Sequence, residues 1–338
     1  LLIDKLAEND RVAMVVYAGS SGLVLPSTSG LYKETVLSAL DQLQAGGSTN
    51  GGSGIQLAYK VAREKFIKGG TNRVILCTDG DFNVGVTDQG SLTRLIEEEA
   101  KSGVFLSVLG FGAGNLKDST MEKLADRGNG NYAYIDTPNE ARKVLVEQLG
   151  GTLVIIAKDV KLQLEFNPRQ VAAYRLIGYE NRLLRAEDFN DDKKDAGEIG
   201  AGHTVTALYE LVPAEGEAPA AKADELKYQQ PARLSDAASD ELLTLKLRYK
   251  EPEGDTSKLI ETVLKDAGES YARASEDFRF ASAVAAFGLM LRDSQYKGDL
   301  TYGAVAELAQ AARGADENGY RAEMIELVKK AAGLAPAR

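Results

Sequence analysis

The sequence has very little of the two residue types on which many catalytic and transition-metal sites depend. It contains one histidine, His203, and one cysteine, Cys77, in 338 residues. A single histidine argues against His-based metal sites and against Ser-His-Asp chemistry, and a single cysteine excludes a disulfide within the chain. Because Cys77 lies inside an apolar run, we expect a buried and inert thiol. A disulfide-free chain of this size can occur on either side of a membrane, so cysteine usage leaves the compartment open.

Long apolar runs and excess positive charge are also absent. No run in the sequence reaches the ~18 to 20 apolar residues that a membrane-spanning helix needs. Lys and Arg number 40 against 50 Asp and Glu, so the net charge is −10. This balance argues against nucleic acid or anionic lipid as the main partner and favours divalent cations or basic protein surfaces. The sequence opens on Leu1 in mid-pattern, without a signal peptide or starting Met, so we expect the natural N-terminus to lie upstream.

The first half of the chain alternates short apolar runs with amphipathic segments. Its central stretch, NRVILCTDGDFNVG at 72–85, carries an apolar run that is typical of a strand buried on both faces of a parallel sheet. Further strands are predicted at 12–17, 104–109 and 131–135, a short hairpin arm at 23–25, and helices at 33–44, 55–66, 91–101, 115–127 and 140–148. Strands that alternate with helices predict an α/β domain with a doubly wound, mainly parallel sheet over residues 1–157.

The pattern changes after this domain. Residues 160–166, 205–211 and 243–249 alternate strictly between apolar and polar, which is typical of antiparallel strands with one solvent-facing side. We therefore predict an antiparallel, β-sandwich-like module over 158–252, with polar loops at 190–202 and 214–231. From Lys258 the chain is predicted to be helical, which makes 253–338 a C-terminal helical region.

Two loops of the α/β domain combine oxygen-bearing side chains with glycine. Asp79 follows the central strand directly, and ligands of open α/β sheets bind beyond the carboxyl ends of the strands. The other loop, GGSTNGG at 46–52, contains Thr49 and precedes a helix. A hydroxyl and a carboxylate at one edge suit Mg²⁺, Mn²⁺ or Ca²⁺ better than zinc or copper. The alternative is that Asp-Gly only turns the chain.

The amino-acid sequences of these two loops resemble those of a known family. GGSTNGGSGI at 46–55, followed by VILCTDGDFNVG at 74–85, resembles the von Willebrand factor type A domain, a Rossmann-like fold. The resemblance implies a metal-ion-dependent adhesion site built from three loops: an Asp-x-Ser-x-Ser, a Thr and the Asp of a Thr-Asp-Gly. Carried over by motif, Thr49 is the threonine ligand and Asp79 the aspartate, which commonly acts through a water. In that family an acidic residue of a protein partner completes the metal coordination.

The chain departs from the family pattern because it contains no Asp-x-Ser-x-Ser. We interpret this as N-terminal truncation, which would remove the central strand of the sheet and expose its apolar edges. With Thr49 and Asp79 alone, metal binding by this chain should be weak or absent, although Mg²⁺, Mn²⁺ or Ca²⁺ is expected in the intact protein. The combination with the second half resembles uncharacterised bacterial envelope proteins with a C-terminal domain of unknown function. That resemblance implies a cell-envelope location, periplasmic or extracellular.

These observations lead to one functional hypothesis and one alternative. The hypothesis is a non-enzymatic protein-binding module for adhesion or assembly, whose metal-ion-dependent site is incomplete in this chain. The alternative is a metal-independent structural scaffold of the bacterial cell envelope. A hydrolase using carboxylates near Asp79 is disfavoured, since the sequence offers no clear pair of acids for general acid–base catalysis.

Overall fold

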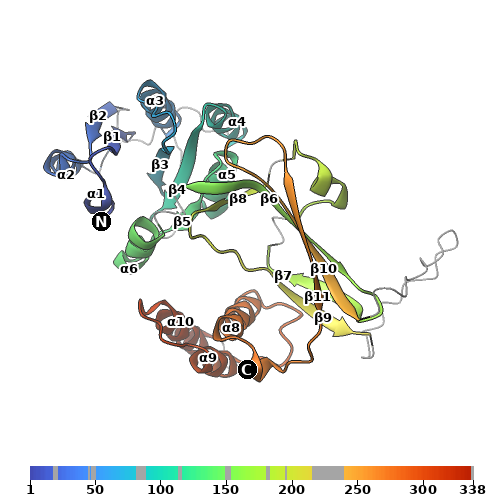
Figure 1. Ribbon diagram of the computed structural model, residues 1–338. Coiled ribbons are helices and arrows are strands. Elements are labelled where there is room, and N and C mark those ends of the chain that lie inside the picture. The colour runs from blue at the N-terminus through green and yellow to red at the C-terminus, as the bar shows by residue number, and fades with distance from the viewer. Residues whose placement is uncertain are drawn as a thin grey trace. The chain divides into compact units, whose positions relative to one another are not determined.

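A computed structural model describes most of the chain (Figure 1). The described residues are 1–17, 22–44, 46, 51–80, 89–112, 116–148, 154–179, 183–194, 196–214 and 240–335. The chain folds into two compact units. The first unit comprises Leu1–Lys161, Asp191–Thr204 and Arg248–Lys258, and the second comprises Leu162–Asn190, Val205–Leu247 and Leu259–Arg338.

The first unit contains the predicted α/β domain. Its strands are β1 (Arg11–Val16), β2 (Gly22–Ser29), β3 (Asn72–Thr78), β4 (Val104–Gly110) and β5 (Tyr132–Tyr134). Its helices are α1 (Leu2–Lys5), α2 (Lys33–Asp41), α3 (Gly51–Glu64), α4 (Gln89–Ala100), α5 (Asp118–Arg127) and α6 (Pro138–Arg142), the last continued by a π-helical turn, η1 (Lys143–Glu147). Strands β3, β4 and β5 form a parallel sheet in that order. The mainly parallel α/β fold is therefore confirmed.

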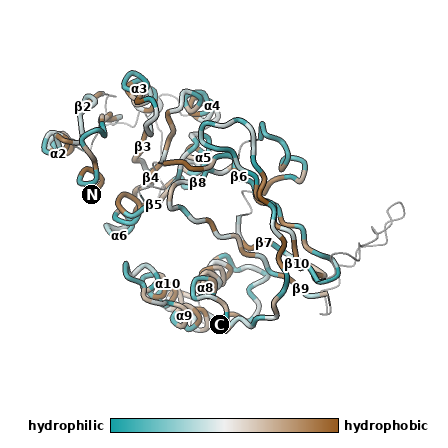
Figure 2. Tube along the Cα trace, in the orientation of Figure 1, coloured by the Kyte–Doolittle hydropathy of each residue, from teal (hydrophilic) through white to brown (hydrophobic). Residues whose placement is uncertain are grey.

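Alternating side chains of the parallel sheet pack into two separate hydrophobic cores, one on each face. On one face, Val74 and Leu76 pack in a buried cluster with residues of α3, α4 and α5, including Leu92 and Leu124. On the other face, Ile75 packs against a smaller cluster that includes Val144 of η1. Burying a Val, Leu or Ile side chain contributes about 1.5–3 kcal/mol. The apolar character of β4 stands out along the chain trace (Figure 2).

Strands β1 and β2 form a separate antiparallel hairpin. In the described part of the first unit, no backbone pairing joins this hairpin to β3. The hairpin has its own small core around Leu25 and Val36. Strand β2 also runs through Pro26, where the sequence predicted the arm to stop. The register shifts between Val12 and Met14, opposite this proline, so the irregular pairing accommodates the missing N–H.

The later strands are antiparallel. They are β6 (Ile155–Phe166), β7 (Val171–Ile177), β8 (Gly197–Gly200), β9 (Leu208–Pro213), β10 (Glu241–Lys250) and β11 (Lys258–Lys265). One sheet has the strand order β11-β10-β6-β8, and β7 pairs with β9 in a second sheet. Strands β6, β10 and β11 run from one unit into the other. Strand β8 lies within 190–202, which the sequence predicted to be a polar loop.

The prediction of helix from Lys258 onward is wrong at its start, because residues 258–265 are strand β11. The sequence KLIETVLK places apolar residues in adjacent pairs four positions apart, a spacing that also fits a helical stripe. Its Ile, Thr and Val residues favour a strand, and pairing with β10 provides the backbone partner.

Helices do dominate the C-terminal part of the second unit. They are α8 (Glu276–Leu291), α9 (Tyr302–Ala311) and α10 (Tyr320–Leu334), and short 3₁₀ turns occur at Ala186–Asn190 (η3) and Tyr271–Arg273 (η5). The hydroxyls of Ser275 and Thr301 cap α8 and α9 by accepting backbone N–H groups, each at 3.1 Å. Ala283, Ala309 and Ile325 form the buried centre where these three helices meet.

Candidate functional site

The carboxyl ends of the three parallel strands are joined by backbone hydrogen bonds. The Phe111 N–H, just beyond β4, donates to the carbonyl oxygen of Thr78 at 2.9 Å. The Ile135 N–H, just beyond β5, donates to the carbonyl oxygen of Gly110 at 2.8 Å. Because the strands are parallel, the residues that follow them emerge at the same edge of the sheet. Asp79 therefore lies where the sequence predicted it, beyond the end of β3.

The turn after β3 fixes the position of Asp79. The Gly80 N–H donates to the Thr78 hydroxyl oxygen at 3.0 Å, and the Lys117 N–H donates to the Asp79 carbonyl oxygen at 3.0 Å. Gly80 has φ +82°, and a Cβ at this position would lie 2.8 Å from Lys117 Cβ. Only glycine satisfies both requirements without strain. The Asp79 backbone is thus held by the residues on both sides of it.

Two aromatic side chains lie beside this turn, and sequence analysis did not identify them. Phe111 and Tyr134 are each 37% exposed, and the Tyr134 hydroxyl donates to the Gly112 carbonyl oxygen at 2.8 Å. A Cβ built on Gly112 would lie 3.9 Å from Asp79 Cβ, which brings the β4 loop against the β3 loop. We call the following residues the carboxyl-end edge: Asp79, Phe111, Gly112 and Tyr134. The sequence signal for this surface was an aromatic residue at the carboxyl ends of β4 and β5.

Tyr17 connects the β1–β2 hairpin to this region. Its hydroxyl donates to the carbonyl oxygen of Cys77 at the end of β3. Its ring lies against α3, where a Cβ on Gly54 would come within 2.5 Å of Tyr17 Cβ. Burial raises the pKa of the Tyr17 phenol, and the charge of Asp79 also raises it, while a hydrogen bond with the Thr78 side chain lowers it. The phenol therefore stays protonated and can donate its hydrogen bond at neutral pH.

The described residues do not make up a divalent-cation site. Mg²⁺ prefers six oxygen ligands and Ca²⁺ six to eight, usually with several carboxylates. Asp79 is the one carboxylate among the four residues of the carboxyl-end edge. The Tyr134 hydroxyl donates to the Gly112 carbonyl oxygen, and the nearby Thr78 hydroxyl already accepts the Gly80 N–H. No group of three His, Cys, Asp or Glu side chains suited to a metal occurs anywhere in the described ranges. Thr49, the predicted threonine ligand, lies outside those ranges.

The expectation of a buried Cys77 is wrong, since the residue is exposed. It lies on the face of β3 opposite Val74 and Leu76, one residue before the strand ends. The protein atoms around the sulfur nevertheless desolvate it, and this raises the pKa of the thiol. Cys77 is therefore accessible at the surface but forms the thiolate poorly.

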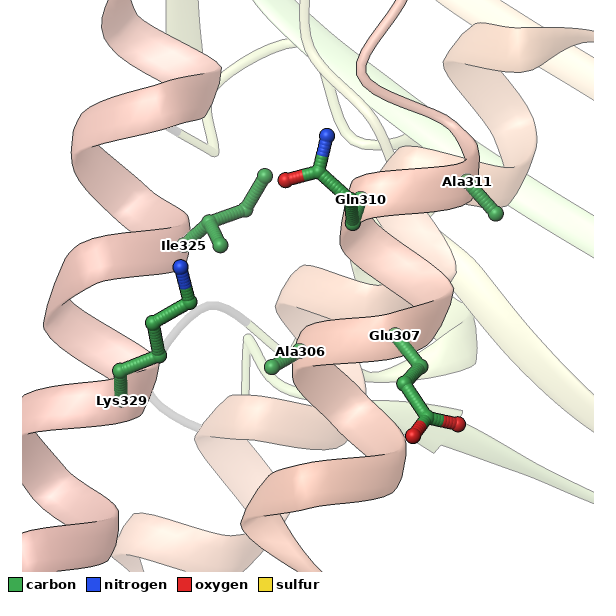
Figure 3. Close-up of a pocket in the computed structure, with 6 residues that line it drawn as sticks. All are labelled: Ala306, Glu307, Gln310, Ala311, Ile325 and Lys329. Carbon is green, nitrogen blue, oxygen red and sulfur yellow. The ribbon is translucent and has the colours of Figure 1, made fainter.

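Two shallow hollows lie in the described part of the second unit. One, of about 420 Å³, lies between α9 and α10, where Ile325 and Lys329 of α10 point toward α9 (Figure 3). The other, of about 410 Å³, includes Arg175 and Tyr296. There the Arg175 guanidinium stacks 4.1 Å from the Tyr296 ring centroid and forms an ion pair with Glu210, so its charge is compensated. Neither lining places a nucleophile beside a general base.

The single histidine, His203, is exposed and lies in the turn after β8. Its position agrees with a surface role and gives no support for catalysis. Among the helices that the structure describes, none is both long and apolar enough to span a membrane.

Comparison with known proteins identifies the family. Residues 151–334 match the family model described as "Uncharacterized protein YfbK, C-terminal", and residues 1–148 match the von Willebrand factor type A domain. The chain belongs to the YfbK family. It is 47% identical over 335 residues to "Uncharacterized protein YfbK" of Escherichia coli (strain K12). The alignment covers 99% of this chain and 57% of that relative's length.

Two solved structures align with this chain at low sequence identity. A von Willebrand factor type A protein from Catenulispora acidiphila aligns over 95% of this chain and 75% of its own, at 18% identity and a TM-score of 0.48. Manganese-loaded TRAP protein of Plasmodium vivax aligns over 64% of this chain and 84% of its own, at 15% identity and a TM-score of 0.36. The von Willebrand factor type A assignment supports a protein-interaction module in the first half of the chain.

Proposed function

We propose that this chain is a non-enzymatic protein-binding module for adhesion or assembly, and that the carboxyl-end edge is its contact surface. One observation carries the proposal: the ends of β3, β4 and β5 are joined by backbone hydrogen bonds and carry, in that order, Asp79, Phe111 and Tyr134. The backbone hydrogen bonds from Phe111 to Thr78 and from Lys117 to Asp79 hold these groups in place before any partner arrives. A preorganised surface loses little conformational entropy on binding.

The chemistry of the edge suits a protein partner. Aromatic residues are enriched in the centres of protein interfaces because they bury large areas at low entropic cost. Phe111 and Tyr134 offer such rings on two neighbouring strand ends. The Asp79 carboxylate, at the neighbouring end of β3, can accept charge-assisted hydrogen bonds from a Lys or Arg of the partner.

The role of metal distinguishes two versions of this proposal. The version that the family resemblance implied has Mg²⁺, Mn²⁺ or Ca²⁺ held by Thr49 and Asp79, with an acidic partner residue completing the coordination. The single carboxylate among the described residues of the edge supports little or no metal contribution in this chain. We therefore propose that Asp79 selects a basic partner side chain here. Chelation of divalent cations with EDTA should leave binding unchanged.

The alternative is a metal-independent scaffold of the bacterial cell envelope that binds through its antiparallel sheets. The exposed apolar residues on β11 favour this second candidate. It predicts that Asp79→Ala and Thr49→Ala both leave partner binding intact, whereas the first proposal requires Asp79.

Quantitative capture of binding proteins by the immobilised chain tests the proposal. We expect Asp79→Ala and Phe111→Ser to reduce capture of a given partner at least tenfold. The matched controls are Asp41→Ala, an exposed acid at the end of α2, and Phe66→Ser, whose ring is 43% exposed and lies near Gly103 at the amino end of β4. Equal loss in the controls, or full capture by Asp79→Ala and Phe111→Ser, would contradict the proposal. Loss of capture in EDTA would restore the metal-dependent version.

A further inference from the structure

Strand β11 is an edge strand in the described part of the chain and carries apolar residues on both faces. It is the terminal strand of the sheet ordered β11-β10-β6-β8, so no strand among the described residues pairs with its outer edge. All eight of its residues are exposed. Leu259 and Val263 project from one face and Ile260 and Leu264 from the other, since side chains alternate along a strand. Unpaired backbone groups beside exposed aliphatic residues are a template for adding another strand.

The charges of β11 do not block such an addition. Lys258 forms an ion pair with Glu251, and Lys265 forms one with Asp240 at 2.6 Å. Both bridges lie at the ends of the β10–β11 hairpin, so each lysine already has a counter-charge in the single chain. Lysine on an edge strand commonly prevents edge-to-edge pairing, and here that protection is partly neutralised.

The sequence of β11 is complementary to itself when read in the antiparallel direction. Two symmetric registers overlap the strand most fully. A register centred on Glu261 places two glutamates directly opposite each other, which is unfavourable. A register centred on Thr262 places Ile260 opposite Leu264 and Thr262 opposite its own copy.

The Thr262-centred register also pairs charges. It places Lys258 opposite Asp266, the residue that follows β11. The two-fold symmetry of the assembly makes this charge pair, like the Ile260–Leu264 pair, occur twice. On the other face the register places Glu261 opposite Val263, with Lys265 and the second copy's Glu261 at the two diagonal positions, within reach of long side chains. In this register no like charges face each other, and every aliphatic residue on the Ile260 face has an aliphatic partner.

We propose that β11 is a self-association strand through which two copies of this chain form a continuous antiparallel sheet, in the register centred on Thr262. The occupant of the free edge is a second copy. The assembly is two-fold and closed, because the outer edge of β11 in each copy is occupied by β11 of the other copy. It goes beyond the proposed protein-binding function by giving each assembly two carboxyl-end edges, which would raise the avidity for a partner with repeated sites.

Sedimentation equilibrium of the 338-residue chain tests the association. The paired strands form a short interface, so we expect dimers with a dissociation constant of about 10 to 100 µM. Leu264→Glu should weaken dimerisation at least tenfold because it places a carboxylate opposite Ile260. Leu259→Glu is the matched control: the two leucines are both 52% exposed, but position 259 faces Lys265 in this register, so dimerisation should be unchanged or stronger.

A charge exchange tests the register itself. Lys258→Glu and Asp266→Lys should each weaken homodimers about tenfold, since each places like charges opposite each other twice. When the two variants are mixed, both cross-strand pairs become complementary, so heterodimers should form with roughly the wild-type affinity. A folding defect in either variant would not produce this recovery.

Several outcomes would overturn the proposal. A chain that stays monomeric up to about 1 mM would do so, because that is at least ten times the expected dissociation constant. A dimer that tolerates Leu264→Glu, or a mixture of the two charge variants that does not recover, would place the interface elsewhere. Slow hydrogen exchange at the outward amides of β11 in a monomeric chain would show that another segment of the same chain covers the edge.

Discussion

The connection that Tyr17 makes between the hairpin and the parallel sheet gives a quantitative prediction. Tyr17→Phe keeps the ring against Gly54 and removes only the hydroxyl that donates to the Cys77 carbonyl. Loss of a partly buried hydrogen bond that leaves one acceptor unpaired costs about 1–2 kcal/mol. For a unit of this size, the melting temperature should fall by roughly 3–6 °C.

Urea unfolding followed by circular dichroism measures this cost. Tyr32→Phe is the control, because Tyr32 is exposed and its hydroxyl makes no observed hydrogen bond with the described residues, so its free energy of unfolding should change by less than about 0.5 kcal/mol. Equal stability of Tyr17→Phe and the wild type would refute the structural role of the hydroxyl. A loss above about 3 kcal/mol would show that Tyr17 does more than donate to the Cys77 carbonyl and share a hydrogen bond with the Thr78 side chain.

The contribution of the Tyr17 hydroxyl to stability has a defined pH dependence. Burial raises the pKa of Tyr17 above its usual value of 10.0 in the folded state, whereas in the unfolded chain the phenol ionises near that value. The contribution of the neutral phenol to stability is therefore fully present below pH 10 and is lost as the pH rises from 10 toward the folded-state pKa. The stability difference between wild type and Tyr17→Phe should shrink over that interval. A constant difference up to about pH 11 would contradict this reasoning.

Four further predictions concern other parts of the molecule. Gly130→Ala should cost at least about 3 kcal/mol of unfolding free energy, because its Cβ would lie 1.8 Å from the Leu106 carbonyl oxygen. Gly288→Ala, in the open middle of α8, should instead stabilise the fold by about 0.5–1 kcal/mol. Urea unfolding measures both changes, and equal effects would contradict the packing around Gly130. Lys250→Met should lower the free energy of unfolding by about 3–5 kcal/mol, because it leaves the Asp159 carboxylate without its ammonium partner at 2.5 Å. Lys329→Met, at the exposed pair with Glu326, should lower it by less than about 1 kcal/mol. Cys77 should react with a thiol reagent at about pH 8 several times more slowly than an unstructured cysteine, since its raised pKa keeps it protonated; an equal rate would show that its sulfur is not desolvated. Gly80→Ala should lower partner capture, because its positive φ and its contact with Lys117 Cβ set the Asp79 turn, and unchanged capture would separate the turn from binding.

The α/β part of the fold could be predicted because its signals are local. Apolar runs such as Val74–Cys77 bounded by turn residues occur nearly where β3 and β4 lie, and the helices between them show the expected periodicity. Strand β11 could not be predicted in the same way. Its paired apolar residues fit a helix as well as a strand, and only the pairing with β10, a contact between distant positions, decides the outcome.

The candidate site was predictable in part for the same reason. Asp79 follows its strand directly, so the rule for open α/β sheets places it at the carboxyl edge. Phe111 and Tyr134 join it only through the order of β3, β4 and β5 and through hydrogen bonds between their loops. Tyr17 and the exposure of Cys77 depend on how the hairpin lies against β3, which no local pattern specifies.

The most direct test of the proposed binding surface is site-specific photo-crosslinking. A photoreactive phenylalanine analogue at position 111 would stand at the carboxyl-end edge, and the same analogue at position 66 would stand near the amino end of β4. We predict that a partner protein crosslinks from position 111 and not from position 66, that Asp79→Ala abolishes the crosslink, and that EDTA does not. Equal crosslinking from both positions, or a crosslink from 111 that survives Asp79→Ala at full yield, would contradict the account.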